Sequence, residues 1–156
     1  MISLKAVSGL PILFDYGKLI FAPGIGRPYP EPQSRSLEEV KPYLADPRAA
    51  TLNPVYLIYR DVYLKTDKAL FLQHNLRYDI TIIFPGRLGR EFPKTIGHYH
   101  ETKPGTNLSY PEIYEVIAGT AKFLFQKIES PDAVKEIYLI TAKPGEKVIV
   151  PPDFGH

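Results

Sequence analysis

The sequence contains no cysteine and no tryptophan, and it has one methionine among its 156 residues. Without cysteine, the chain cannot form disulfide bonds, thiolate-ligated metal sites or cysteine nucleophiles. No apolar run approaches the ~20 residues of a membrane-spanning helix, and the N-terminal segment lacks the long apolar stretch of a signal peptide. The 19 basic and 17 acidic side chains give a net charge of +2, which is too balanced for a typical nucleic-acid-binding surface. We therefore expect a cytoplasmic protein with neither membrane nor nucleic-acid partners.

Proline and tyrosine, by contrast, are abundant, with 16 and 11 residues. This composition is typical of a protein rich in loops and strands, and the length suits one domain. Two short apolar patches, 11–14 and 19–21, flank Asp15-Tyr16-Gly17 and predict a hairpin. The stretch 24–32 contains three prolines and is expected to be irregular or extended.

One short helix is predicted, in the segment 36–44. Ser36 can cap its N-terminus, and Glu39, three residues later, completes a capping box. Pro42 is expected to shorten the helix, because proline cannot donate the backbone hydrogen bond of a helix interior.

From about residue 55 onward, the sequence predicts strands separated by turns. Runs rich in β-branched and aromatic residues recur along this part of the chain, at 55–64, 78–84, 112–128, 133–142 and 146–150. Gly119-Thr120 divides one of these runs and predicts a hairpin there. Many short strands with almost no helix indicate an all-β sandwich or barrel.

Two of the four histidines form the sequence His98-Tyr99-His100. In a strand, residues i and i+2 point to the same face, so the two imidazoles can close on one metal ion. The alternative is a pair of solvent-exposed histidines on a loop. His74 has no motif around it and is expected to be a surface or packing residue.

Glu112 and Glu115 lie in the run that follows. Strand alternation places Glu112, Tyr114 and Val116 on one face, and Glu115 on the other. A carboxylate that faces the interior needs a partner, because burial of an isolated charge is costly. Periodicity alone leaves open which glutamate faces inward, and both could be solvated edge charges.

These residues, followed by the run from Gly145 to His156, resemble the two motifs of the cupin superfamily. Glu112 precedes Gly119 by the seven positions of the first motif, which favours Glu112 over Glu115 as the ligand. The segment between His100 and Glu112 is longer than the motif and is interpreted as a loop insertion. Phe92 stands where the first motif has a glycine, and Asp153 where the second has one.

A narrower resemblance covers the chain from roughly residue 15 onward. The stretches TIIFPGRLGREFPKTIGHYHE, EIYEVIAGTAKFLFQ and KPGEKVIVPPDFGH are similar to the archaeal-type cupin glucose-6-phosphate isomerase family. The resemblance implies a single all-β domain over 1–156, built as a small double-stranded β-helix or jelly-roll barrel. Residues 1–50 would form an N-terminal arm with the short helix, and 51–156 the barrel.

The resemblance also implies a set of site residues. One divalent metal ion per subunit would be held by His98, His100, Glu112 and His156, with Fe²⁺ expected first and Mn²⁺, Ni²⁺ or Zn²⁺ as alternatives. Glu112 and Tyr114 would act in catalysis. The sugar phosphate would be bound by Thr81, Thr95 and Gly97, with Tyr56 as a further substrate residue.

The function implied is the metal-dependent interconversion of glucose 6-phosphate and fructose 6-phosphate, in glycolysis and gluconeogenesis. The same metal ligands would also suit a dioxygenase that uses Fe²⁺, or a sugar-binding cupin without turnover. The extended arm with its aromatic residues suggests a homodimer. Members of the family continue beyond the position of His156, so we expect the barrel to lack its closing strands, with weakened metal binding and low activity.

Overall fold

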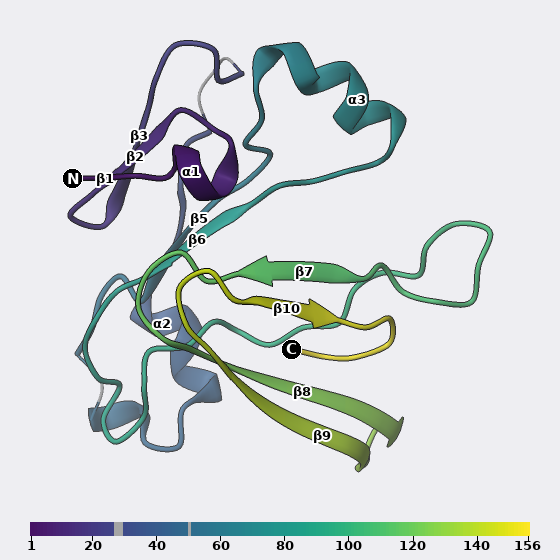
Figure 1. The fold of residues 1–156 in the computed structure, drawn as a ribbon. Helices are drawn as coiled ribbons and strands as arrows, with labels where there is room; N and C mark the ends of the chain where they lie inside the picture. Colours follow the sequence, from purple (N-terminus) through teal and green to yellow (C-terminus); the bar gives the residue numbers. More distant parts are fainter. Residues whose placement is uncertain (27–29, 50) are drawn as a thin grey trace. The chain divides into compact units, whose positions relative to one another are not determined.

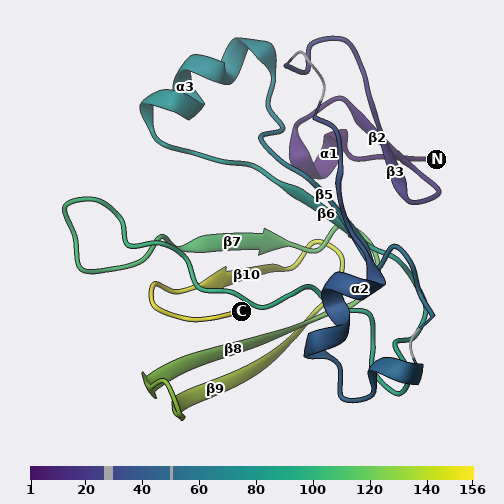
Figure 2. The same cartoon turned by 180° about the vertical axis from the view of Figure 1, so that it is seen from behind.

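The computed structural model describes residues 1–26, 30–49 and 51–156, and the chain divides into two compact units, Met1–Ile96 and Gly97–His156 (Figures 1 and 2). Within the described ranges, the strands form four antiparallel sheets of two or three strands and no closed barrel. The predicted all-β, cupin-like class is confirmed, whereas the organisation of 1–156 as a single domain stays a prediction. None of the described helices has the length and hydrophobicity needed to cross a bilayer.

The first unit begins with the predicted hairpin. Its sheet has the order β1-β2-β3, with β1 at Ile2–Ser3, β2 at Ile12–Asp15 and β3 at Lys18–Phe21, and with helix α1 at Lys5–Ser8. Tyr16 and Gly17 both have positive φ angles, of 43° and 86°, as a two-residue turn between twisted antiparallel strands requires. Part of the stretch 24–32, which was expected to be irregular, lies outside the described residues.

The predicted capping box is present in helix α2 at Leu37–Val40. The Ser36 side chain accepts from the backbone N–H of Glu39, and the Glu39 carboxylate accepts from the backbone N–H of Ser36. The helix passes into a short 3-10 turn, η1, at Lys41–Tyr43, where Pro42 lies. A second 3-10 turn, η2, spans Pro47–Ala49.

Replacement of Ser36 by Ala is expected to lower the melting temperature by about 2–4 °C, because the hydroxyl that accepts from the Glu39 N–H and donates to the Glu39 carboxylate is lost. Hydrogen bonds from the backbone and side chain of Ser36 lower the pKa of Glu39 below 4.5. The contribution of the Glu39 carboxylate is therefore present above pH 4.5 and is lost as the pH falls through the lowered pKa. Thermal denaturation of both proteins at pH 7 and pH 3 checks this, and an equal difference at the two pH values would contradict it.

The second sheet of this unit has the order β4-β5-β6, with β4 at Gln33–Arg35, β5 at Tyr56–Tyr59 and β6 at Ile80–Ile83. A buried cluster of Val40, Val55, Tyr56 and Leu88 lies within the unit. The run expected as one strand over 55–64 ends at Tyr59, since Asp61 adopts a left-handed φ of 55°.

The prediction of a single short helix, with only strands after residue 55, is wrong. The 3-10 turn η3 at Lys65–Asp67 leads into helix α3 at Lys68–Gln73. The sequence of α3, KALFLQ, consists largely of strong helix formers. The runs predicted as strands, 55–64 and 78–84, leave this segment without an element, although it contains no β-branched residue that would disfavour a helix.

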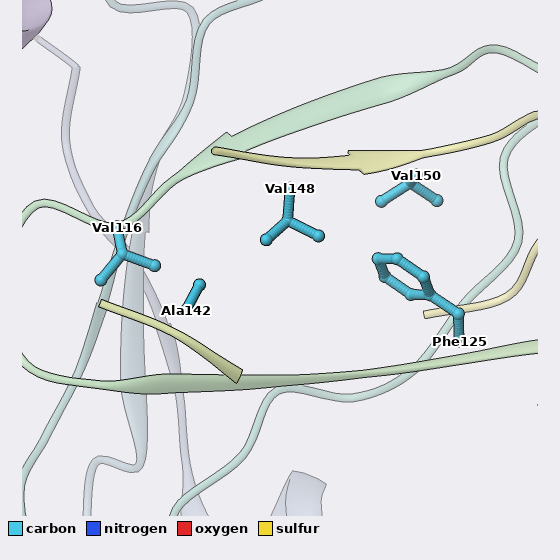
Figure 3. Close-up of a cluster of buried hydrophobic side chains, with 5 residues drawn as sticks. All are labelled: Val116, Phe125, Ala142, Val148 and Val150. Carbon is cyan, nitrogen blue, oxygen red and sulfur yellow. The ribbon is translucent and has the colours of Figure 1, made fainter. Parts of the chain in front are cut away.

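The second unit consists of two strand pairs that face each other. Strand β7 at Glu112–Glu115 pairs with β10 at Lys147–Val150, and β8 at Ala121–Ser130 pairs with β9 at Ala133–Ala142. Their facing side chains form a buried cluster of Val116, Phe125, Ala142, Val148 and Val150 (Figure 3).

The predicted hairpin across Gly119-Thr120 is wrong, because β7 and β8 belong to different pairs. Gly119 has a φ of 78° and turns the chain from one layer to the other. Val116, before the turn, and Phe125, after it, then belong to the same buried cluster. Burial of apolar surface between the layers is what selects this arrangement over local pairing.

Candidate metal centre

The three histidines of the predicted metal site are brought together by backbone pairing within the second unit. The backbone N–H of His98 donates to the His156 carbonyl at 2.9 Å, and that of His156 donates to the His98 carbonyl at 3.1 Å. Gly155 forms a similar reciprocal pair with Gln126 of β8, at 2.8 and 2.9 Å. The segment that carries His156 therefore lies between the His98 segment and β8.

The imidazoles of His98, His100 and His156 converge. One nitrogen atom from each ring lies within 4.8 Å of the corresponding atoms of the other two rings. The ring centroids are 4.6 to 5.3 Å apart. The side chains of His100 and His156 are 17% and 5% exposed, so these two imidazoles are largely shielded from water.

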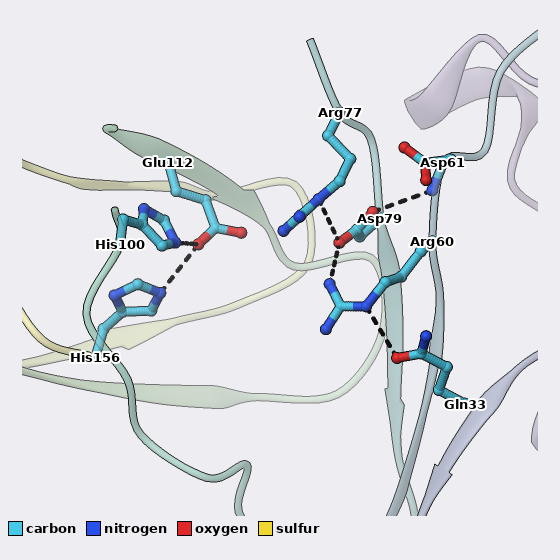
Figure 4. A network of polar contacts seen from close by, with 8 residues as sticks. All are labelled: Gln33, Arg60, Asp61, Arg77, Asp79, His100, Glu112 and His156. Atoms are coloured by element: carbon cyan, nitrogen blue, oxygen red, sulfur yellow. Dashed lines mark hydrogen bonds and ion pairs between the residues drawn. The ribbon is translucent and has the colours of Figure 1, made fainter. Parts of the chain in front are cut away.

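Glu112 is the carboxylate that meets these rings. Its Oε2 lies 3.0 Å from Nε2 of His156 and 3.3 Å from Nε2 of His100 (Figure 4). Glu115, on the opposite face of β7, forms an ion pair with Lys147 of β10 at 3.3 Å. The structure thus decides the alternative that strand periodicity left open.

The tautomer of His100 is set by a backbone carbonyl. Nδ1 of His100 lies 2.7 Å from the carbonyl oxygen of Tyr110. Because a carbonyl can only accept, Nδ1 carries the proton, and Nε2 of the neutral ring presents a lone pair. That lone pair faces Oε2 of Glu112, a second acceptor.

Two acceptors at 3.3 Å repel each other unless a cation or a proton lies beside them. In addition, Nδ1 of His156 is buried without a hydrogen-bond partner among the described residues, which is costly for a polar atom. Imidazole nitrogens and a carboxylate oxygen are donors that first-row divalent metal ions bind well. The donor set therefore fits a divalent cation.

Electrostatics keep Glu112 ionised. Burial of the carboxyl group by itself raises its pKa. Hydrogen bonds from His156 and Tyr114, together with the positive charge of His156 or His100 whenever either ring is protonated, outweigh burial and hold the pKa below 4.5. A carboxylate that is charged at neutral pH can bind a cation or accept a proton.

Tyr114 of β7 contributes to the same group of side chains. Its ring meets that of His156 edge to face, with centroids 5.8 Å apart, and also packs on Phe123, with centroids 5.1 Å apart. It lies two residues after Glu112, on the same face of the strand.

The predicted substrate residues are divided between the two units. Tyr56 is buried on β5, where its hydroxyl accepts from the backbone N–H of Ile96 at 3.3 Å, and Thr81 is exposed on β6. Thr95 is exposed near the end of the first unit, and Gly97 opens the second unit. A β carbon at Gly97 would lie 3.4 Å from the His156 carbonyl oxygen. The roles of these residues in substrate binding stay predictions.

Two features of the site were not predicted from sequence. The Tyr110 carbonyl has no sequence signal, because every residue type carries a backbone carbonyl. Asp153 did give a signal, since it stands where the second cupin motif has a glycine. It adopts a φ of 67°, which aspartate tolerates better than most residues.

Comparison with known proteins finds one matching family model and several similar proteins. A sequence model of the family described as Glucose-6-phosphate isomerase (GPI) matches residues 35–156. The chain is 35% identical to the glucose-6-phosphate isomerase of Pyrococcus abyssi over 82 residues, which are 53% of this chain and 38% of that relative. It is 31% and 28% identical to the glucose-6-phosphate isomerases of Thermococcus kodakarensis and Thermococcus gammatolerans over 124 residues, or 78% of this chain and 59% of each relative. The chain thus spans 38% to 59% of the length of these relatives.

Proposed function

Since this chain belongs to the glucose-6-phosphate isomerase (GPI) family, we propose that it takes part in the metal-dependent interconversion of glucose 6-phosphate and fructose 6-phosphate. The observation that carries the proposal is the convergence of three imidazoles, from His98, His100 and His156, with the ionised carboxylate of Glu112. We propose that this site binds one divalent metal ion per subunit, with Fe²⁺ expected first and Mn²⁺, Ni²⁺ or Zn²⁺ as alternatives.

An aldose–ketose isomerisation moves a hydrogen between C1 and C2 of the sugar. A divalent ion held by His98, His100, Glu112 and His156 would supply Lewis-acid chemistry at the sugar carbonyl. Glu112 is the proposed base, because its carboxylate is ionised at neutral pH and lies at the group of converging imidazoles. Tyr114 lies beside it and holds its carboxylate by a hydrogen bond.

Two routes remain for the hydrogen. In the enediol route, Glu112 removes a proton from the carbon beside the carbonyl and returns it to the neighbouring carbon. In the hydride-shift route, the hydrogen moves directly between the carbons and Glu112 only positions the oxygens. Isomerisation in deuterium oxide tests the first route: solvent deuterium in the product supports it, and the absence of deuterium weakens it.

We assign the binding of the sugar phosphate to Thr81, Thr95, Gly97 and Tyr56, as the family resemblance implies. Threonine hydroxyls and a glycine N–H are suitable phosphate donors. The ammonium group of Lys94 is already engaged by Glu91 and by the Tyr43 carbonyl, so the proposal gives it no phosphate role.

The variants Thr81→Val and Thr95→Val are expected to raise the KM for fructose 6-phosphate about tenfold each and to leave metal affinity unchanged. Valine keeps the shape of threonine but removes the hydroxyl donor, which is worth about 1–1.5 kcal/mol. Steady-state kinetics and metal titration of the same preparations check both parts. An unchanged KM in both variants would remove these threonines from the phosphate site.

A coupled assay tests the function itself. The full chain is incubated with fructose 6-phosphate, and the formation of glucose 6-phosphate is followed with Mn²⁺ or Fe²⁺, before and after treatment with EDTA. Turnover that EDTA abolishes and metal restores supports the proposal. Oxygen uptake would instead indicate a dioxygenase, and sugar binding without turnover a lectin-like cupin.

The proposal also includes a cytoplasmic location and a homodimer. The dimer is testable by sedimentation velocity at micromolar concentration, where a monomer alone would contradict it.

A further inference from the structure

Ser109 and Asp153, which the proposed reaction does not use, form a closed pair of hydrogen bonds in the second unit. The backbone N–H of Ser109 donates to Oδ1 of Asp153 at 3.0 Å. The backbone N–H of Asp153 donates in return to Oγ of Ser109 at 2.6 Å. The side chain of each residue therefore accepts a hydrogen bond from the backbone N–H of the other.

Both partners are unusual for their positions. Ser109 is polar but buried, with 8% of its surface exposed. Asp153 has a left-handed φ of 67°, a conformation that strains most residues with a β carbon. A glycine there would avoid the strain, but it could not accept the Ser109 N–H.

The pair connects the two segments that position the proposed metal ligands His100 and His156. Ser109 directly precedes Tyr110, whose carbonyl accepts from Nδ1 of His100 at 2.7 Å and so sets the tautomer of that ring. Asp153 precedes His156 by three residues, and the intervening segment is anchored to β8 through Gly155 and Gln126. A shift of either loop would therefore move the carbonyl behind His100 relative to the imidazole of His156.

We propose that Ser109 and Asp153 form a clamp that positions His100 and His156 for the metal ion, by holding the Tyr110 carbonyl in line with Nδ1 of His100. The two are positioning residues, since neither belongs to the group of converging imidazoles and their hydrogen bonds are to each other. The inference rests on the proposed metal site. Groups that orient metal-bound histidines are typically worth 10- to 100-fold in metal affinity.

Three variants separate the clamp from general stability. Asp153→Gly keeps the left-handed backbone and removes the acceptor. Asp153→Asn keeps both the tolerance for that backbone and an acceptor oxygen. Ser109→Ala removes the acceptor for the Asp153 N–H alone. Asp61→Gly is the matched control, because Asp61 is an exposed aspartate with a φ of 55° in the other unit.

The affinity of the wild type and of each variant for Co²⁺ is measured by titration, together with the visible absorption of the bound Co²⁺ and the melting temperature without metal. We expect Asp153→Gly to bind Co²⁺ at least tenfold more weakly with an altered spectrum, and Asp153→Asn and Asp61→Gly to stay within threefold of the wild type. Ser109→Ala should fall between these, and the double variant with Asp153→Gly should be no weaker than Asp153→Gly alone. Wild-type affinity and spectrum in Asp153→Gly, or equal losses in Asp153→Asn and Asp153→Gly, would overturn the clamp.

A metal-free readout separates this inference from the proposed function. Two-bond ¹⁵N–¹H correlation spectra of the imidazoles, recorded at a pH where they are neutral, report which nitrogen carries the proton. We expect His100 to be protonated at Nδ1 in the wild type and to become a mixture of tautomers in Asp153→Gly. If the wild type binds no metal, the proposed function fails. An unchanged His100 tautomer in Asp153→Gly contradicts the clamp in either case.

Discussion

Replacement of any one of His98, His100 and His156 by Ala is expected to weaken the binding of Mn²⁺ or Zn²⁺ more than about 100-fold, because loss of a direct ligand exceeds the effect of an orienting group. Activity should fall with it. Each ring contributes one nitrogen to the set of three nitrogens that lie within 4.8 Å of one another. Loss of any one imidazole would therefore remove one of the proposed metal ligands. Isothermal titration and measurement of metal content by mass spectrometry check this result.

His74→Ala is the matched control for these variants. His74 is exposed after helix α3 in the first unit, and it belongs to no metal-binding group among the described residues. His156→Asn is a useful second variant, since the ring of His156 also packs against Tyr114 and Phe125 and its complete removal would leave a cavity. Unchanged metal content in both His98→Ala and His100→Ala would refute the site.

The second large effect is expected from Glu112→Gln, compared with Glu115→Gln in the same strand. Glu112→Gln keeps the shape of the side chain but removes the charge beside His100 and His156, so we expect metal affinity and turnover to fall about 100-fold or more. Glu115→Gln removes only a partly exposed ion pair with Lys147, which is worth about 0–1 kcal/mol. Its activity should stay within twofold of the wild type.

The pH dependence of stability gives an independent readout for Glu112. Burial raises its pKa, but the hydrogen bond and charge of His156 and the contacts with Tyr114 and His100 hold the pKa of the folded protein below 4.5. The stabilisation from the ionised carboxylate is therefore present above pH 4.5 and is lost as the pH falls through the lowered pKa. Because other carboxyl groups such as Glu39 also have lowered pKa values, urea denaturation without metal, between pH 3 and pH 7, should reveal a larger loss of stability in the wild type than in Glu112→Gln. Identical pH profiles, or equal losses of activity in Glu112→Gln and Glu115→Gln, would contradict the assignment.

Local features of the fold could be predicted where neighbouring residues decide them. The turn at Tyr16-Gly17 and the capping box of Ser36 and Glu39 depend on hydrogen bonds and φ angles within a few residues. Helix α3 was missed because its leucine and phenylalanine residues suit a strand as well as a helix. The pairing of β7 with β10, rather than with β8, depends on burial between layers, which the order of strands along the chain does not contain.

By itself, the sequence determined the chemistry available to this protein: no thiol, four histidines, two of them on alternate residues, and a strand that begins with a carboxylate. The tertiary structure decided which of these groups meet. It selected Glu112 over Glu115 through the face of β7, and brought His156 beside His98 through backbone hydrogen bonds. It also set the tautomer of His100 through the Tyr110 carbonyl. These outcomes depend on contacts between segments far apart in the chain, and such contacts form only when burial of the apolar faces brings the segments together.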